Sequence, residues 1–398
     1  MAARGSPSST KKFARRRGEI LDVASAHINA FGVRGMTLTG VARALDLDTS
    51  SVTYYFKRKD DLAYACLERT LIWMRDSATA AAAAGDPAGV TRLFLQAHLD
   101  LYAADDAAAP RLAILSDMHS MAGNRRTALS ALYAETANIL RVVLGGGNPT
   151  HSLVSTLFLL SAVHWMPSWI GSYAVADFPR VAERMLDILL HGIGNAQDWP
   201  SGLPAPDRST DDEAQNRFLL AATTLINRDG YHGASVEKIA AELGVSTGSF
   251  YHHHQTKDEL VLACFERSFA LIDQARAIGE GIVGDHGAQL AGTFASLLAL
   301  QSEGPNPLLR SSAYQALPPE LRQRMLHRTM QMTLHFCGKI ADGIAETSLR
   351  AVDPLLAGHI FVSAMNAAAD LRAWTNSASV RSENSGLFKV MQHGITGL

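Results

Sequence analysis

The chain has 398 residues, of which 47% are hydrophobic and 19% charged, and its net charge is −2. This length predicts two or three globular domains, and the charge excludes a chain that is basic throughout, so nucleic-acid binding must come from local patches. Three cysteines are too few for a disulfide framework and favour a reduced, cytoplasmic setting. The N-terminus lacks the apolar run of a secretory signal. The apolar run 153–169 contains His164 and Pro167, so we expect a buried helix there and not a membrane span.

The first part of the chain predicts a basic arm followed by three short helices. Residues 1–12 are small, polar and basic, and we expect a disordered arm. Within 13–62, apolar residues at helical spacing predict a helix that Gly32 and Gly35 close. Thr37 can cap a second helix, and a polar third helix follows over 48–55.

A second stretch, 244–260, repeats the pattern of 46–62 at an offset of 198 residues without a gap. From position 32 to 69 the two copies share 13 identities over 38 positions. In the second copy Gly244 can take the left-handed conformation that ends a helix, and Thr256 with Glu259 forms a capping box. A short helix, a sharp turn and an exposed helix follow the helix-turn-helix plan for the DNA major groove, and their repetition predicts an internal duplication.

A long Ala- and Leu-rich helical region follows each copy. Asn148-Pro149 and Asp353-Pro354 both suit a helix start, and Trp169 and Trp374 recur at the same new offset of 205. No alternating strand pattern is present, so we predict an all-α chain. The expected domains are a disordered basic arm (1–12), helix-turn-helix domain 1 (13–62), helical regulatory domain 1 (63–197), a Pro-rich linker (198–212), helix-turn-helix domain 2 (213–260) and helical regulatory domain 2 (261–398).

With both copies in view, the chain resembles the TetR family of transcriptional regulators, present twice in tandem. The family run Gly-Val-Ser-x-Gly-x-aromatic-Tyr-x-His, followed by Lys-x-x-Leu, is met by Gly244, Val245, Ser246, Gly248, Phe250, Tyr251, His253, Lys257 and Leu260. The first copy keeps Lys59 and Leu62 but has Thr53 and Tyr55 at the Tyr and His positions. The resemblance implies two tandem TetR-like units, each with a helix-turn-helix head and a C-terminal ligand and dimerisation domain, in one covalent pseudo-dimer.

The expected DNA contacts lie on the two polar helices and the lysines after them, where hydroxyls, aromatic edges and cations suit phosphates and base edges. They are Thr49, Ser50, Ser51, Thr53, Tyr54, Tyr55 and Lys59 in the first head (residues 13–62), and Thr247, Gly248, Ser249, Tyr251, His252, His253 and Lys257 in the second head (residues 213–260). Consecutive histidines point in different directions on a helix, so we predict no metal site at 252–254.

The two heads differ in charge. Residues 11–60 hold ten Lys/Arg and five Asp/Glu, whereas 211–260 hold four and eight. Because phosphate neutralisation supplies most non-specific affinity, we expect the first head to bind DNA more tightly and with a steeper salt dependence.

Large apolar and aromatic side chains with occasional polar ones could line a pocket for a small apolar or aromatic ligand, although the same residue types equally suit a helical core. The candidates are Phe94, His98, Met118, Phe158, His164 and Trp165 in the first regulatory domain and Phe294, Met330, Phe336, Asn366 and Asp370 in the second.

The sequence thus predicts a ligand-responsive DNA-binding regulator, most simply a repressor, on an operator with two unlike half-sites. The late helices, about 149–170 with 179–194 and about 354–375 with 384–396, would pair as an intrachain four-helix bundle. The alternative is a sensor or assembly protein in which one head no longer binds DNA. Further pairing of chains into a homodimer stays open. No nucleotide-binding, metalloprotease or hydrolase motif is present, and we expect neither an enzyme nor a cofactor.

Overall fold

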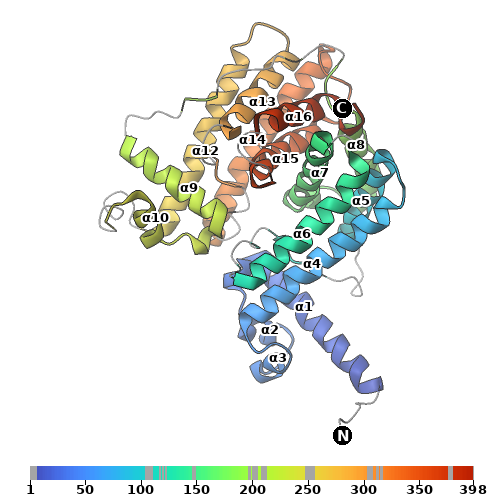
Figure 1. Cartoon of the computed structure of the whole chain (residues 1–398), viewed down its shortest axis with the longest axis vertical. Helices are drawn as coiled ribbons and strands as arrows, with labels where there is room; N and C mark the ends of the chain where they lie inside the picture. Colours follow the sequence, from blue (N-terminus) through green and yellow to red (C-terminus); the bar gives the residue numbers. More distant parts are fainter. Residues whose placement is uncertain are drawn as a thin grey trace. The chain divides into compact units, whose positions relative to one another are not determined.

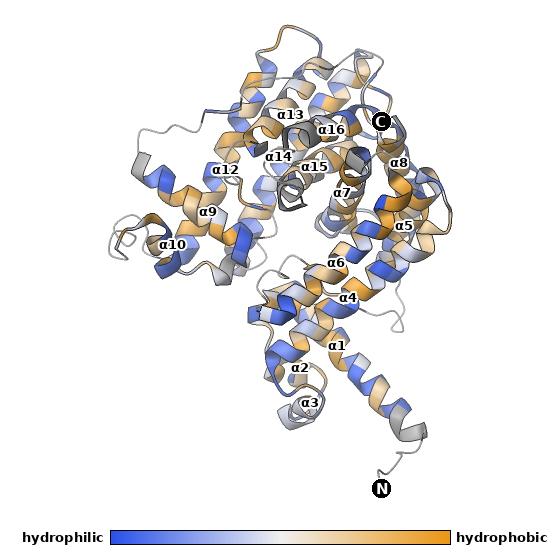
Figure 2. Ribbon diagram, in the orientation of Figure 1, coloured by the Kyte–Doolittle hydropathy of each residue, from blue (hydrophilic) through white to orange (hydrophobic). Residues whose placement is uncertain are grey.

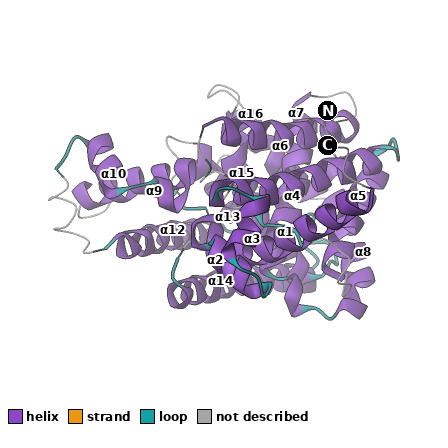
Figure 3. Ribbon diagram, turned by 90° about the horizontal axis from the view of Figure 1, so that it is seen from below, coloured by secondary structure: helices purple, strands orange, loops and turns teal. Residues whose placement is uncertain are grey.

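The computed structural model describes residues 7–103, 111–115, 118, 121, 123–145, 149–195, 199, 205–207, 213–246, 256–302, 308–310, 313, 317–374 and 380–397. Within these ranges the regular structure is helical, and no strand is present (Figure 3). The prediction of an all-α chain is confirmed. By their internal contacts the residues form two compact units, Met1–Asp76 with Ala104–Glu135, and Ser77–Ala103 with Thr136–Leu398. This division differs from the predicted boundary at 198–212. The late helices of the first half pack on those of the second half, and this packing places them in one unit.

The first unit contains the first head (Figure 1). Its helices are α1 (Pro7–Gly35), α2 (Leu38–Ala44), α3 (Thr49–Tyr55), most of α4 (Lys59–Ala82) and the beginning of α6 (Gly123–Leu144). One face of α1 is buried at Ile20, Ala24 and Ile28, at the helical spacing that the sequence predicts. Gly32 interrupts α1 with φ 71° and ψ 169°, a conformation that only glycine adopts readily.

The N-terminal arm is partly helical. We predicted disorder over residues 1–12, but α1 begins at Pro7, so Lys11 and Lys12 lie on a helix. Proline suits a first helical turn, and the lysines, arginines and alanine that follow are good helix formers. The helix therefore extends N-terminally from the part of α1 that is anchored in the core.

The second unit contains the remaining helices, which are α5 (Pro87–Ala103), α7 (Pro149–Trp165), α8 (Phe178–His191), α9 (Glu213–Gly233), α10 (Val236–Leu243), α12 (Lys257–Glu280), α13 (His286–Ser302), α14 (Pro319–Ala345), α15 (Pro354–Trp374) and α16 (Val380–His393). Helices α9, α10 and the start of α12 form the second head. Helix α12 packs on α13, α13 on α14 and α14 on α15, while α5 packs on α8. Figure 2 shows hydrophobic residues along α5 and α8.

Helix α7 is buried along most of its length and contacts α5, α15 and α16. A helix that is apolar all round can be stable only in such a position. Helix α8 also contacts both α15 and α16, so α7 and α8 each pack on the last two helices. Their bounds differ slightly from the predicted ones, because α7 gives way to a 3-10 turn, Met166–Ser168, at Pro167. None of the described helices is both long and apolar enough to cross a membrane.

Candidate DNA-binding heads and regulatory core

Helix α3 presents the polar residues of the first head. Val52 is fully buried and anchors the helix, while Tyr54 is 67% exposed. Ser50 is exposed, and Thr49, Ser51, Thr53 and Tyr55 are half-buried. The Thr53 hydroxyl donates to the Ser50 carbonyl at 3.0 Å, one turn earlier. The face opposite Val52 therefore offers hydroxyls and aromatic rings at the surface.

The turn after the second helix has a similar backbone conformation in both heads; it follows α2 in the first head and α10 in the second. Gly244 has φ 67°, as predicted, and Asp46 takes the equivalent left-handed conformation with φ 54°. The Leu47 N–H donates to the Ala42 carbonyl at 2.9 Å, and the Val245 N–H donates to the Ala240 carbonyl at 3.0 Å. Aspartate tolerates this conformation better than most residues, so the first head keeps the turn without glycine.

Both lysines lie where the sequence placed them, at the first residue of a helix. Lys59 begins α4 and donates its Nζ to the Arg34 carbonyl. Burial, together with the charge of Arg34, lowers the pKa of Lys59. Lys257 begins α12, whose predicted capping box is confirmed, since Thr256 and Glu259 each accept from the other's backbone N–H, at 3.2 and 3.3 Å.

The recognition segment of the second head lies outside the described residues. This segment, 247–255, contains the candidates Thr247, Gly248, Ser249, Tyr251, His252 and His253. For these six side chains DNA contact stays a prediction.

In each head, one asparagine side chain forms hydrogen bonds to the backbone of a later segment, and the two asparagines occupy matching positions. The Asn29 side chain on α1 donates to the Leu112 carbonyl at 2.9 Å and accepts from the Ile114 N–H at 2.7 Å. Asn227, the matching residue on α9, donates to the Leu308 carbonyl at 2.8 Å and accepts from the Arg310 N–H at 2.9 Å. Sequence comparison finds the two asparagines as identities, but it does not reveal what they bind.

Two further contacts recur in both parts of the chain. The Cys66 thiol donates to the Leu21 carbonyl at 3.7 Å, and the Cys264 thiol donates to the Leu219 carbonyl at 3.6 Å. Burial raises the pKa of these thiols to about 11 and about 12, so both are inert structural groups. Thr70 accepts from the Ala113 N–H at 3.0 Å, as Ser268 accepts from the Leu309 N–H at 2.9 Å.

In the first regulatory region, α5 and α7 carry most of the ligand candidates. The His98 ring lies 4.5 Å from the Phe94 ring and its Nδ1 donates to the Phe94 carbonyl at 2.8 Å. Burial lowers the pKa of both His98 and His164 to about 4, so both rings are neutral near pH 7. Phe158 is fully buried, and the buried Trp165 Nε1 has no hydrogen-bond partner among the described residues. Met118 is buried in the first unit.

In the second regulatory region, the aromatic candidates pack on each other. The Phe361 ring lies 5.0 Å from Phe294 and 4.6 Å from Phe336, which are both fully buried. This arrangement favours a core role for these two phenylalanines. Met330 on α14 and Asn366 on α15 are half-buried. The Asp370 side chain lies outside the described part of the structure.

Comparison with known proteins finds a family similarity in the second head. Residues 218–264 match the family model of bacterial regulatory proteins of the tetR family. This segment is therefore similar to the tetR family. The match begins in α9 and ends within α12, and it includes α10 and the turn at Gly244.

Two curated relatives are also similar to the chain. The HTH-type transcriptional regulator BetI of Paraburkholderia xenovorans (strain LB400) is 32% identical over 87 residues, which are 21% of this chain and 45% of BetI. The transposon Tn10 TetC protein of Escherichia coli is 34% identical over 56 residues, 14% of this chain and 28% of TetC. The chain thus spans less than half the length of these relatives.

Solved TetR-family structures each cover about half of the chain. A TetR regulator from Chloroflexus aurantiacus covers 46% of this chain and 96% of its own, at 21% identity and a TM-score of 0.37. FadR from Bacillus subtilis, in complex with stearoyl-CoA, covers 46% and 98%, at 18% identity and a TM-score of 0.37. TM-scores at this level do not establish a common arrangement of helices. No enzyme is among these proteins.

Proposed function

We propose that the chain is a DNA-binding transcriptional regulator built from two tandem TetR-like units. Both units would act within one chain, as a pseudo-dimer with two unlike heads, on an operator with two unlike half-sites. The recurrence of the asparagine, cysteine and hydroxyl contacts in both parts supports the duplication. The TetR-family match over 218–264 supports the function.

The observation that carries the pseudo-dimer is a reciprocal contact at the ends of α8 and α16. A Cβ added to Gly192 would meet the Gln392 backbone carbonyl, and one added to Gly394 would meet that of Leu190, both well inside 3.0 Å. Gly192 and Gly394 are 202 positions apart, and so are Leu190 and Gln392. A contact that returns with its roles exchanged is characteristic of a twofold interface between equivalent surfaces.

Backbone hydrogen bonds hold the two helix ends together. The N–H groups of Ile193 and Gly194 donate to the carbonyls of Met391 and Gln392 at 3.1 and 2.9 Å. From the other side, the Thr396 hydroxyl donates to the Leu190 carbonyl at 2.6 Å. Such close approach of two backbones requires glycine at the crossing, which accounts for both residues.

Ion pairs make the pairing specific for unlike partners. Arg184 on α8 pairs with Asp353 at 2.6 Å, and Arg350 pairs with Asp187 at 2.9 Å. The positions that match Arg184 and Asp353 in the other half hold Gly386 and Asn148. Those that match Asp187 and Arg350 hold Lys389 and Gly145, so neither pair of matching positions has opposite charges. Pairing of two second halves would place Lys389 opposite Arg350, a like-charge contact that disfavours it. The charges therefore favour association of the first half with the second.

Charge distinguishes the two proposed heads. With ten Lys/Arg and five Asp/Glu over 11–60, against four and eight over 211–260, the first head attracts phosphate more strongly. We assign DNA contacts to Thr49, Ser50, Ser51, Thr53, Tyr54, Tyr55 and Lys59, and to Thr247, Gly248, Ser249, Tyr251, His252, His253 and Lys257.

Charge-removing variants of the two lysines test both heads in the full chain. Lys59→Gln and Lys257→Gln should each weaken binding to a selected operator and reduce the slope of log K against log salt by roughly 0.9, the value for one lost phosphate contact. Lys389→Gln removes an exposed lysine of α16, far along the chain from either head, and should leave both quantities unchanged. If Lys59→Gln or Lys257→Gln behaved like Lys389→Gln, that head would be a structural passenger, as in the alternative sensor or assembly protein.

The regulatory signal would be a small apolar or aromatic molecule bound among α5 and α7. The Nε1 of Trp165, which has no hydrogen-bond partner in the described part of the chain, and the neutral rings of His98 and His164 lie within an apolar surrounding that includes Phe94 and Phe158. In the second half the two phenylalanines pack as core, which favours the first half as the ligand-binding one. A thermal-shift screen of aromatic and aliphatic compounds, repeated with Trp165→Phe, tests this assignment, because a compound that uses the indole N–H should lose affinity.

A further inference from the structure

Three aromatic rings meet at the surface of the first head. The Phe13 ring on α1 lies 4.7 Å from the Tyr55 ring and 6.2 Å from the Tyr54 ring, and the two tyrosine rings are 5.2 Å apart. Phe13 is 41% exposed and Tyr54 is 67% exposed. These three residues form what we call the aromatic surface. Phe13 lies on a helix because α1 begins at Pro7, and its ring contacts both tyrosines of α3.

Helix α3 needs such support. It has only seven residues, and an isolated helix of that length does not form in water. Val52 is the buried residue of the helix, so one side chain fixes its inner face. The Phe13 ring contacts the outer part of the helix at both tyrosines, and edge-to-face or tilted ring pairs of this kind restrict the rings they hold. Phe13 therefore limits the rotamers of the two tyrosines that α3 offers to a partner.

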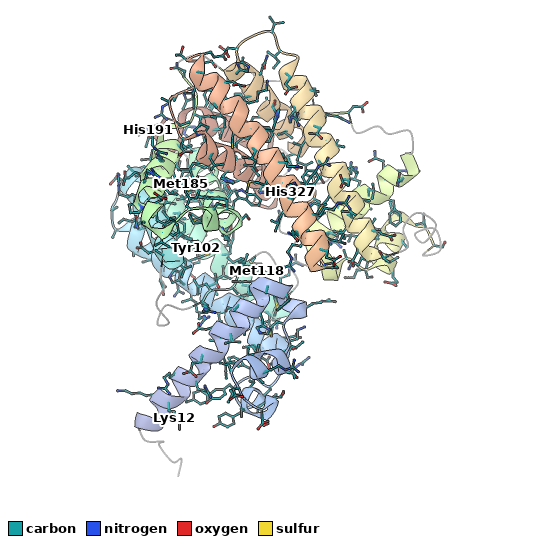
Figure 4. All side chains as sticks on the ribbon, turned by 180° about the vertical axis from the view of Figure 1, so that it is seen from behind. Lys12, Tyr102, Met118, Met185, His191 and His327 are labelled. Atoms are coloured by element: carbon teal, nitrogen blue, oxygen red, sulfur yellow. The ribbon has the colours of Figure 1, made fainter. Side chains whose placement is uncertain are left out.

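The charges around the aromatic surface indicate that its partner is DNA. Lys11 and Lys12 are exposed on the same N-terminal turns of α1, where Figure 4 labels Lys12. Arg17 lies over the ring of Phe56, the residue after α3, at 5.2 Å. Exposed lysines beside exposed rings suit a phosphate backbone next to the apolar groups of a groove. In the major groove, the apolar group that a ring edge can contact is the thymine methyl.

We propose that Phe13 is a positioning residue that fixes Tyr54 and Tyr55, and that the aromatic surface gives the first head a preference for thymine methyl groups in its half-site. The inference rests on the proposed function. At the position aligned with Phe13 the second copy has Asp211, and Tyr54 and Tyr55 align with His252 and His253. The second copy therefore lacks the phenylalanine ring and has imidazoles in place of the two phenol rings, so the preference belongs to one half-site.

The test uses the full chain and a duplex that the wild-type protein selects from a random pool. Phe13→Ala should weaken binding about tenfold, equivalent to ~1.4 kcal/mol, and the loss of base preference should be confined to one half-site. Phe13→Tyr should restore binding because it keeps the ring, and Phe13→Leu should not. Phe31→Ala is the matched control, since Phe31 is another exposed phenylalanine of α1, 52% exposed. It should bind like the wild type.

Two readouts separate positioning from a loss of structure. The slope of log K against log salt should be the same for Phe13→Ala and the wild type, because the phosphate contacts remain, whereas unfolding of the first head would reduce it. Replacing thymine by uracil in the affected half-site should weaken wild-type binding but leave Phe13→Ala unchanged.

Each unfavourable result has one meaning. Wild-type affinity for Phe13→Ala, or equal loss at both half-sites, would overturn the positioning role. Equal wild-type affinity for the thymine and uracil duplexes would overturn the methyl preference. Failure of the wild-type protein to select any duplex would refute the proposed function and this inference with it.

Discussion

Replacing Gly394 by alanine tests the crossing of the two halves most sharply. The new Cβ would lie within 3.0 Å of the backbone of Leu190 and His191, and Gly394 has φ 75°. The unfavourable φ costs about 1–3 kcal/mol in stability. Forcing the helix ends apart adds roughly 1–3 kcal/mol, as overpacking does in a well-packed core. We therefore expect Gly394→Ala to lower the free energy of unfolding by about 2–6 kcal/mol.

Gly85→Ala is the matched control. Gly85 has φ 77° but no heavy atom of the described residues within 4 Å of an added Cβ, so its substitution carries the conformational cost alone. The difference between the two variants measures the close approach of the backbones. Gly192→Ala should resemble Gly394→Ala, because the contact is reciprocal.

Urea unfolding followed by tryptophan fluorescence suits this comparison. Of the five tryptophans, Trp165, Trp169, Trp199 and Trp374 belong to the second unit, which contains the crossing. If Gly394→Ala were no less stable than Gly85→Ala, the two helix ends would not be in contact in solution. The support for the pseudo-dimer would then be lost.

Three further predictions concern stability. Asn29→Ala and Asn227→Ala should each lower the free energy of unfolding by about 1–3 kcal/mol, since each leaves a backbone N–H and a carbonyl without their partner. Urea unfolding measures this loss, and a loss near zero would show that water replaces the side chain. Arg350→Asp should destabilise the chain by about 1–2 kcal/mol through repulsion from Asp187, and adding Asp187→Arg should recover most of it; a double variant no better than the single one would contradict the ion pair. Burial lowers the pKa of His98 and His359 from 6.5 to about 4, so the unfolded chain takes up protons that the folded chain does not. The free energy of unfolding should therefore fall as the pH drops from about 6.5 toward 4, by about 2 kcal/mol per histidine at pH 5, and His359→Phe should flatten this dependence in unfolding curves at pH 7 and 5.

The described helix ends of the heads could be predicted from the sequence because local residues determine them. Gly32 and Gly230 were expected to be equivalent, and they have φ values of 71° and 74° with ψ values of 169° and 166°. The capping box at Thr256 needs only neighbouring residues. Phe13 was missed as a site residue because its role depends on a helix that starts earlier than the polar sequence of 1–12 suggested.

The regulatory regions were predicted less completely, because their key contacts join distant residues. Trp169 was expected to match Trp374, but its stacking on His359 at 4.9 Å depends on the pairing of α7 with α15. Gly192 and Gly394 were missed because they recur at an offset of 202, and the late helices were aligned at 205. Such a shift between neighbouring helices becomes evident only when their packing is known.

The stoichiometry of the complex with DNA tests the central proposal most directly. The full chain would be mixed with a duplex that it selects from a random pool, and the mass of the complex measured by light scattering or native mass spectrometry. We predict one chain of 42.8 kDa per duplex and a selected sequence with two unlike half-sites. Two chains bound to a palindromic sequence would contradict a regulator whose two heads act within one chain.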